Sequence, residues 1–310
     1  MKFAFVFPGQ GSQSVGMLDA WADNAAVQRT LEQAGAALGQ NLAGLIAQGP
    51  AEDLNLTTNT QPVMLTAALV TYAAWQAAGG PQPAVVAGHS LGEYSALAAA
   101  GAISLDDAVR IVRVRADAMQ AAVPVGAGAM AAVLGLSDDD VRSVCTEAAQ
   151  GEVVEAVNFN APAQVVIAGH KAAVERACEL AKQRGAKRAL LLPVSAPFHS
   201  SLLRPAAEVL QKALADVTIN VPSIPVINNV DVAVADTPDA IRDALVRQAW
   251  HPVRWVETVQ AMKAQGVTHI VECGPGKVLN GLTKRIDKDL VGLAITDPAS
   301  MQAALELLQG

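Results

Sequence analysis

The amino-terminal part of the chain alternates short apolar runs with longer segments in which apolar residues have a helical spacing. The runs Phe3–Phe7 and Ala84–Ala87 each have the length of a buried strand. Helical spacing is found near Met17 and Ala25, and over Met64–Ala77, Glu93–Ala100 and Leu105–Ala121. Strands that alternate with helices in this way predict a parallel sheet with helices on its faces.

The order of the predicted elements changes after Gly126. Residues 127–196 read strand, helix, strand, strand, helix, strand, which is the split βαβ pattern of a ferredoxin-like domain. The six elements are Met130–Leu136, Ser137–Gln150, Val154–Asn158, Gln164–Ala168, Lys171–Arg184 and Arg188–Val194. Helix and strand units then resume, at Leu202–Ala215, Pro225–Val230, Pro238–Ala249, Thr268–Val271, Val278–Ile286 and Leu290–Ala294. We therefore expect a small domain (127–196) inserted into a larger α/β core domain (1–126 and 197–310).

The segment Gly88-His89-Ser90-Leu91-Gly92 joins the second apolar run to a helix. Strand, Gly-x-Ser-x-Gly and helix, in this order, form the layout of a nucleophile elbow. The glycines permit a sharp turn that lifts the serine hydroxyl off the sheet edge, where the first N–H groups of the helix also point. Such a serine can attack an acyl group while backbone N–H groups hold the resulting oxyanion. The alternative is a glycine-rich turn without chemistry, but the flanking strand and helix favour the elbow.

Composition narrows the class of protein. Hydrophobic residues make up 52% of the 310 residues and aromatic residues only 4%, so the core consists mostly of Ala, Val and Leu, which suits helices packed on a parallel sheet. The net charge of −7 argues against a nucleic-acid-binding protein, which needs a basic face. No apolar stretch approaches the roughly 18 residues of a membrane span. We therefore expect no nucleic-acid partner and no contact with a membrane.

The start of the chain and its cysteines indicate a cytoplasmic protein. Met1–Phe7 resembles the apolar part of a signal peptide, but Pro8 ends the run early, which favours a buried first strand. Cys145, Cys178 and Cys273 are odd in number and lack the spacing of a metal site. We expect them to be small buried residues in a reducing compartment, and we expect no metal.

A nucleophilic serine needs a base, and the chain has five histidines. His89 lies within the elbow, where its ring would point away from the serine, and His170 and His269 have positions typical of structural or solvent-facing residues. His199 follows the last strand of the small domain, where the chain returns to the core, and such junctions commonly carry catalytic residues. Position therefore favours His199 over His251 as the base. No acid before His199 stands out as its orienting partner, so a backbone carbonyl is the alternative.

Arg115 is the second strong indication of function. It falls inside the apolar stripe of the helix predicted over Leu105–Ala121, three residues after Val112 and four after Ile111. Burying a guanidinium without a partner is strongly unfavourable. Two partners are equally compatible with the sequence: an acidic residue of the protein, or a substrate carboxylate bound by the two-pronged guanidinium.

The loop Pro8–Gln13 follows the first strand and contains two glycines. It has neither the G-x-G-x-x-G pattern nor a Walker lysine, so nucleotide binding is not expected. In an elbow enzyme, a loop after a second strand supplies the other donor of the oxyanion hole. The backbone N–H of Gln10 is the candidate.

Together these segments resemble a known family. They occur in family order with Gln61-Pro62, Asn158-Phe159-Asn160, Gln164–Gly169, Ala196–Ser200, Gln248, Pro252-Val253 and Gly274–Leu279. The chain resembles the malonyl-CoA:acyl carrier protein transacylases, which prime bacterial fatty-acid synthesis. The resemblance covers almost the whole length and implies a hydrolase-like parallel-sheet core with an inserted ferredoxin-like (βαββαβ) domain.

The resemblance also implies roles for individual residues. Ser90 would be the acylated nucleophile and His199 its general base and acid, with the N–H groups of Gln10 and Leu91 as the oxyanion hole. Further implied roles are a clamp on the malonyl carboxylate for Arg115, a carbonyl that orients the base for Gln248, and positions in the substrate pocket for Gln61 and Phe198.

The activity implied is ping-pong transfer of a malonyl group from malonyl-CoA to the phosphopantetheine thiol of acyl carrier protein, through a malonyl-serine intermediate. Phe198 accompanies malonyl selection in this family, whereas a smaller residue accompanies methylmalonyl. We expect a cytoplasmic monomer without a cofactor. A serine hydrolase or thioesterase with the same Ser90–His199 pair is the alternative, and it would need no buried arginine. A catalytically silent docking module for carrier protein is a third possibility.

Overall fold

A computed structural model of the chain describes residues 1–309 and contains two sheets. The larger sheet has five parallel strands in the order β7-β2-β1-β8-β9. These strands are β1 (Phe3–Phe7), β2 (Val85–Gly88), β7 (Val226–Ile227), β8 (His269–Cys273) and β9 (Val291–Ile295). Phe7 pairs with Gly88, the last residues of β1 and β2, so the loops after these two strands lie side by side. The predicted parallel sheet is confirmed.

Helices cover both faces of this sheet, as the alternation of side chains along β1 requires. Phe5 and Phe7 belong to one apolar cluster and Ala4 and Val6 to another. The first cluster includes residues of α1 (Ala25–Leu38), α4 (Thr57–Ala77), α5 (Gly92–Ala99), α6 (Leu105–Ala122), α9 (Arg204–Ala215), α10 (Pro238–Gln248) and α13 (Pro298–Gln309). The second includes residues of α11 (Trp255–Ala264) and α12 (Val278–Ile286). Both faces of β1 are therefore buried.

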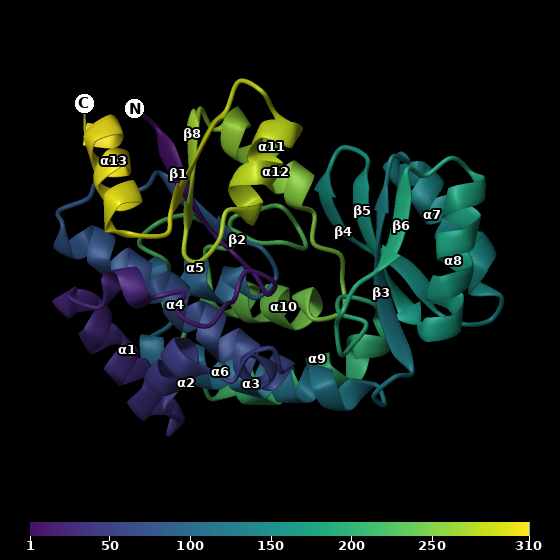
Figure 1. Cartoon of the computed structure of the whole chain (residues 1–310), viewed down its shortest axis with the longest axis horizontal. Helices are drawn as coiled ribbons and strands as arrows, with labels where there is room; N and C mark the ends of the chain where they lie inside the picture. Colours follow the sequence, from purple (N-terminus) through teal and green to yellow (C-terminus); the bar gives the residue numbers. More distant parts are fainter. Residues whose placement is uncertain (310) are drawn as a thin grey trace.

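The smaller sheet is antiparallel and has four strands in the order β4-β5-β3-β6. Its elements are β3 (Gly128–Leu134), α7 (Asp138–Ala149), β4 (Val154–Ala161), β5 (Gln164–His170), α8 (Lys171–Gln183) and β6 (Arg188–Leu191). The βαββαβ connection with this strand order is the ferredoxin-like arrangement. Figure 1 shows this sheet beside the larger body, with α7 and α8 on its outer side.

The strand β4 of the smaller sheet is hydrogen-bonded to the core segment that precedes α11. Phe159 donates its backbone N–H to the carbonyl of Val253 (3.0 Å), and Val253 donates to the carbonyl of Val157 (2.8 Å). Asn158 and Val253 consequently form a parallel bridge just before α11. The small antiparallel sheet and the core domain therefore contact each other through backbone hydrogen bonds as well as through side chains.

Several predicted elements have different ends in the structure. The helix predicted from Met64 begins at Thr57 and continues through Pro62, because it is buried on almost every side and has no polar stripe to mark its start. The strand predicted over Arg188–Val194 ends at Leu191, shortly before Pro193, which has no N–H to donate to a neighbouring strand.

The sequence patterns did not reveal four helical segments. These are α2 (Leu42–Gln48), α3 (Ala51–Leu54), α11 and α13. The helical spacing near Met17 corresponds only to a short 3-10 turn, η1 (Asp19–Trp21), and a second 3-10 turn, η2 (Ser201–Leu203), precedes α9. Of the helices in residues 1–309, none has the length and apolar character that crossing a bilayer requires.

Candidate active site

Ser90 lies in a strained turn between β2 and α5. Its backbone φ is 53°, in the left-handed region that non-glycine residues rarely occupy. A Cβ on Gly88 would lie 1.8 Å from the carbonyl carbon of Gly92, and a Cβ on Gly92 would lie 2.1 Å from the carbonyl oxygen of Phe7. Only glycine fits at both positions, so the Gly-x-Ser-x-Gly spacing is what allows the turn.

Asn229, which the sequence reasoning missed, holds this turn from the neighbouring strand. Its Oδ1 accepts the backbone N–H of Ser90 (2.8 Å), and its Nδ2 donates to the carbonyl of Gly88 (2.7 Å). The backbone N–H of Asn229 donates to Oε2 of Glu93 (2.9 Å). Asn229 follows the short strand β7, which lies beside β2 at the same edge of the sheet. A polar side chain at the carboxyl end of a parallel strand was the signal that could have identified it.

His199 is hydrogen-bonded to the serine. Its Nε2 lies 2.6 Å from Oγ of Ser90. Its Nδ1 lies 2.8 Å from the backbone carbonyl of Gln248 and 3.2 Å from that of His251. Because carbonyls only accept hydrogen bonds, Nδ1 carries the proton and Nε2 is free to accept the serine hydroxyl. The structure thus places a carbonyl, and not a carboxylate, at the position that orients the imidazole.

The surroundings of His199 favour its neutral form. Burial, followed by the positive charge of Arg115, lowers the pKa of His199 to about 3, although the carbonyls of Gln248 and His251 oppose the shift. The imidazole is therefore a free base at neutral pH.

Arg115 is buried, with 2% of its surface exposed, and its guanidinium points at the serine. Nη1 donates to Oε1 of Gln61 (2.7 Å), while Nη2 donates to Oγ of Ser90 (3.1 Å) and to Oε1 of Gln248 (3.0 Å). The guanidinium also lies over the ring of Tyr94, with its carbon 5.5 Å from the ring centroid. Within residues 1–309, Arg115 forms no ion pair with an acid. Of the two partners that the sequence left open, the structure thus shows no protein carboxylate in direct contact.

The side chain of Gln248 connects Arg115 to a buried acid. Its Nε2 donates to Oε2 of Glu93 (3.0 Å) and to the backbone carbonyl of Ser90 (2.8 Å). Burial raises the pKa of Glu93 to about 7, against the opposing effects of Gln248, Asn229 and Arg115. Neither Glu93 nor the side chain of Gln248 was identified from sequence, because both act through contacts between distant segments.

Two residues that line the same cavity as Ser90, Gln10 and Leu91, have backbone N–H groups that are free in the part of the chain that the structure describes. Gln10 lies in the loop after β1 and Leu91 immediately follows Ser90, and the pairing of β1 with β2 brings the two loops together. Among residues 1–309, neither the N–H of Gln10 nor that of Leu91 donates a hydrogen bond to another group. Free N–H groups are the donors that an oxyanion hole uses.

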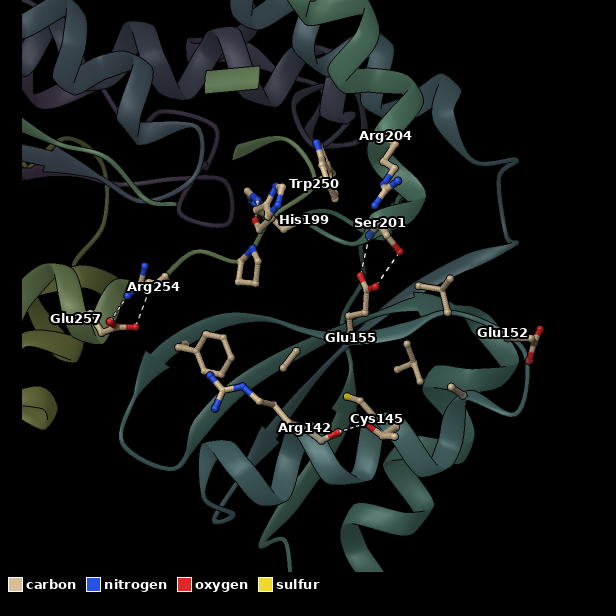
Figure 2. Close-up of a pocket in the computed structure, with 18 residues that line it drawn as sticks. Arg142, Cys145, Glu152, Glu155, His199, Ser201, Arg204, Trp250, Arg254 and Glu257 are labelled. Carbon is tan, nitrogen blue, oxygen red and sulfur yellow. Dashed lines mark hydrogen bonds and ion pairs between the residues drawn. The ribbon is translucent and has the colours of Figure 1, made fainter. Parts of the chain in front are cut away.

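The serine opens into a cavity of about 580 Å³ between the two bodies. Its lining includes Gln10, Gln61, Ser90, Leu91, Arg115, Asn158, Phe198 and His199. A second cavity of about 700 Å³ is lined by His199 but not by Ser90 (Figure 2). The first cavity therefore contains the reacting groups.

The other histidines and the cysteines lie outside this constellation. His89 points its Nε2 at Oδ1 of Asn160 (2.8 Å), and His170 accepts the backbone N–H of Val153 at Nδ1 (2.9 Å). His251 contributes its carbonyl to His199, while its own ring bonds to the carbonyl of Arg247 (2.8 Å). All three cysteines are buried and unpaired.

Comparison with known proteins agrees with this geometry. The family model described as an acyl transferase domain matches residues 4–295. The malonyl CoA-acyl carrier protein transacylase of Escherichia coli strain K12 is 58% identical over 99% of both chains, and that of Bacillus subtilis is 44% identical over 99% of this chain and 98% of its own.

Solved structures give the same result. The acyl-carrier-protein S-malonyltransferase of Burkholderia pseudomallei superposes with a TM-score of 0.97 at 68% identity, covering 99% of this chain and 100% of its own. A malonyl-transacylase solved in complex with a type II PKS acyl-carrier protein superposes with a TM-score of 0.98 at 50% identity, with the same coverage. The chain therefore belongs to the acyl transferase family and, within it, to the malonyl CoA-acyl carrier protein transacylases.

Proposed function

We propose that this acyltransferase moves a malonyl group from malonyl-CoA to the phosphopantetheine thiol of an acyl carrier protein, in support of fatty-acid synthesis. The observation that carries the proposal is the position of Arg115. Its guanidinium is buried, has no acidic partner in contact among residues 1–309, and lies 3.1 Å from Oγ of Ser90. A carboxylate on the acyl group would supply the missing negative charge next to the nucleophile. The names of the relatives support the same substrate and acceptor.

In the first half-reaction, Oγ of Ser90 attacks the thioester carbonyl while Nε2 of His199 takes the hydroxyl proton. The negative charge on the carbonyl oxygen is held by the N–H groups of Gln10 and Leu91. The carbon–sulfur bond then breaks, and the CoA thiolate leaves with the proton that His199 had taken. A malonyl ester on Ser90 remains.

Binding of the malonyl group would also strengthen the base. The positive charge of Arg115 is one cause of the low pKa of His199. A malonyl carboxylate paired with Arg115 neutralises that charge, so the pKa of His199 rises while the substrate is bound. A carboxylated acyl group is thus held in place by Arg115 and also makes His199 a stronger base.

In the second half-reaction, the carrier-protein thiol replaces CoA. His199 takes the thiol proton, the sulfur attacks the ester carbonyl of malonyl-Ser90, and the proton passes to Oγ as the ester bond breaks. Both half-reactions use the same base and the same oxyanion donors, so the two substrates are used in turn.

Phe198 is the proposed determinant of acyl-group size. It lines the cavity that contains Ser90 and directly precedes His199. Its ring occupies space that the extra methyl of methylmalonyl would need. Because one methyl group in a pocket is worth about 1–3 kcal/mol, we expect malonyl to be preferred without methylmalonyl being fully excluded. Competition among malonyl-, methylmalonyl- and acetyl-CoA, with two different carrier proteins, measures this preference.

The central experiment is incubation of the protein with labelled malonyl-CoA, with and without holo acyl carrier protein. We expect label on the protein when the acceptor is absent, and on the carrier protein when it is present. Ser90→Ala should abolish both. Release of free malonate in place of malonyl-carrier protein would indicate a hydrolase or thioesterase. Transfer that survives in Ser90→Ala would refute the serine mechanism.

A further inference from the structure

A glutamate of the small sheet is hydrogen-bonded to the chain next to His199. Glu155, on β4, accepts the backbone N–H of Ser201 at Oε2 (2.7 Å) and the hydroxyl of Ser201 at Oε1 (2.8 Å). Figure 2 shows the side chain rising from its strand toward Ser201, with both contacts drawn. Both carboxylate oxygens thus accept hydrogen bonds from the same residue, which lies two positions after His199.

The backbone at His199 needs such support. Its φ is 63°, in the left-handed region, and a non-glycine residue stays there only when surrounding contacts hold it. On the ring side, Gln248 and His251 fix the imidazole through their carbonyls. On the chain that follows, Ser200 bonds back to Pro197 within the same loop. Glu155 ties the end of this loop to β4 through two hydrogen bonds to Ser201.

Apolar packing holds the start of the loop, where Phe198 contacts a cluster that includes Met130 and Val157 of the small sheet. At Ser201 the loop instead borders a cavity. The 700 Å³ cavity is lined by His199, Ser201 and Glu155 together, so open space adjoins the loop where a solid core would otherwise confine it. Hydrogen bonds to a carboxylate are roughly twice as strong as bonds between neutral groups. Within residues 1–309, no ion pair involves Glu155, so its charge is directed at Ser201.

We propose that Glu155 is a positioning residue for the transfer reaction: by holding Ser201, it keeps Nε2 of His199 at hydrogen-bonding distance from Oγ of Ser90. Glu155 touches neither the substrate cavity nor the reacting atoms. The inference rests on the proposed role of His199 as the base. It makes the geometry of the catalytic pair depend on the small sheet, because β4 carries the residue that holds the loop.

The test is Glu155→Ala, assayed in two ways. We expect kcat for malonyl transfer to fall about tenfold, with KM for malonyl-CoA within twofold, because a small misplacement of a catalytic group lowers the rate while Arg115 still binds the acyl group. The second assay is the rate at which a fluorophosphonate inactivates the protein at Ser90. This reaction needs His199 but no malonyl group, and we expect its rate to fall by a similar factor.

Two further variants separate positioning from a general loss of structure. In Glu155→Gln, the amide oxygen can accept the N–H of Ser201 and the amide nitrogen can donate to its hydroxyl, so both rates should return to within about threefold of wild type. Glu152→Ala is the matched control, because Glu152 lines the same cavity but pairs with Arg176. Both of its rates should stay at the wild-type level.

A folded Glu155→Ala protein that reacts with fluorophosphonate at the wild-type rate would overturn the inference, as would a Glu155→Gln protein no faster than Glu155→Ala. If Glu155→Ala does not fold, Ser201→Ala is measured, which removes only the hydroxyl contact. We then expect a roughly threefold loss in both assays, and no loss would overturn the inference. Failure of the fluorophosphonate to modify Ser90 in the wild-type protein would instead count against the proposed function.

Discussion

The guanidinium of Arg115 donates a hydrogen bond of 3.0 Å to the side-chain oxygen of Gln248. The backbone carbonyl of the same glutamine lies 2.8 Å from Nδ1 of His199. One residue at the end of α10 thus contacts both the cation and the base, and each of these is hydrogen-bonded to Oγ of Ser90. Since one carbon separates the two carbonyl groups of malonate, a fixed distance between the base and the cation suits this acyl group.

Removing the cation should discriminate between acyl groups. For Arg115→Ala we expect kcat/KM for malonyl transfer to fall by about 10²–10³-fold, as the loss of two hydrogen bonds to a charged group predicts. Transfer of an acetyl group, which has no carboxylate, should change by less than about fivefold. Arg113→Ala is the control, because Arg113 lies on the same helix but bonds to Gln40 and Asn59. Equal losses for both acyl groups would assign Arg115 a structural role.

The same cation should contribute, after burial, to the pH range in which His199 works. With a pKa of about 3, His199 remains unprotonated across the range in which the protein is assayed. We therefore expect the fluorophosphonate inactivation rate of Ser90 to show no loss from protonation of His199 between about pH 7 and pH 5. In Arg115→Met, the pKa of His199 should rise, although burial still holds it below its usual 6.5, so the loss of rate on acidification should begin at a higher pH than in the wild-type protein.

Arg113→Met serves as the control for the pH profile, since it removes a positive charge outside the cavity. Its profile should match that of the wild-type protein. A wild-type rate that already declines near pH 6.5, or a profile that Arg115→Met leaves unchanged, would contradict the electrostatic coupling between Arg115 and His199.

The strained turn at Ser90 should depend on Asn229. Asn229→Ala removes the acceptor for the N–H of Ser90 and the donor to the carbonyl of Gly88. We expect the free energy of unfolding to fall by about 2–4 kcal/mol, because buried backbone groups lose their partners, and kcat to fall by about 10²-fold. Urea unfolding and steady-state kinetics measure the two effects.

The neighbouring residue provides the comparison. Asn228 bonds to the backbone of Asp231 and Ala233 and does not reach the elbow. Asn228→Ala should therefore lower stability while kcat stays within about twofold of wild type. If both variants lose activity equally, the effect reflects the whole segment and not the contact with Ser90.

Local sequence patterns were sufficient to single out Ser90, His199 and Arg115, which the structure brings together. The elbow needs glycines at fixed spacing because no side chain fits at Gly88 or Gly92, so the steric requirement is visible in the sequence itself. Arg115 stands out because a charge within an apolar stripe conflicts with its surroundings. His199 was preferred for its place at the return to the core, and the roles of Gln10, Gln61 and the carbonyl of Gln248 came from the family resemblance.

The residues that position Ser90 and its neighbours could not be recognised from the sequence. Asn229 is 139 residues from Ser90 in sequence, and the side chain of Gln248 reaches Ser90 across 158 residues. Their contacts arise only when β7 lies beside β2 and α10 packs near the elbow, and amide side chains carry no local signal of such roles. The start of α4 was missed for a related reason, since a helix buried on nearly all sides has no amphipathic pattern.

Glu272 should make the stability of the fold depend on pH. It is fully buried on β8, its Oε2 accepts the N–H of Asn280 at the start of α12 (2.8 Å), and its Oε1 has no hydrogen-bond partner among residues 1–309. Burial raises the pKa of this carboxyl from 4.5 to about 7. Between these values the folded protein retains a proton that the unfolded chain has released.

The raised pKa fixes the sign of the effect. The protonated Glu272 contributes fully to the free energy of unfolding below about pH 4.5, and this contribution is lost as the pH rises to 7. The shift of the Glu272 pKa corresponds to about 3 kcal/mol. Glu272→Gln keeps a neutral side chain of the same shape at every pH. Measured by urea unfolding, the stability of Glu272→Gln relative to wild type should therefore increase by about 3 kcal/mol from pH 4.5 to pH 8. Glu93 remains in both proteins, so its own titration cancels in the comparison. The exposed Glu208→Gln should follow the wild type, and a Glu272→Gln difference that stays constant with pH would show that Glu272 is ionised throughout.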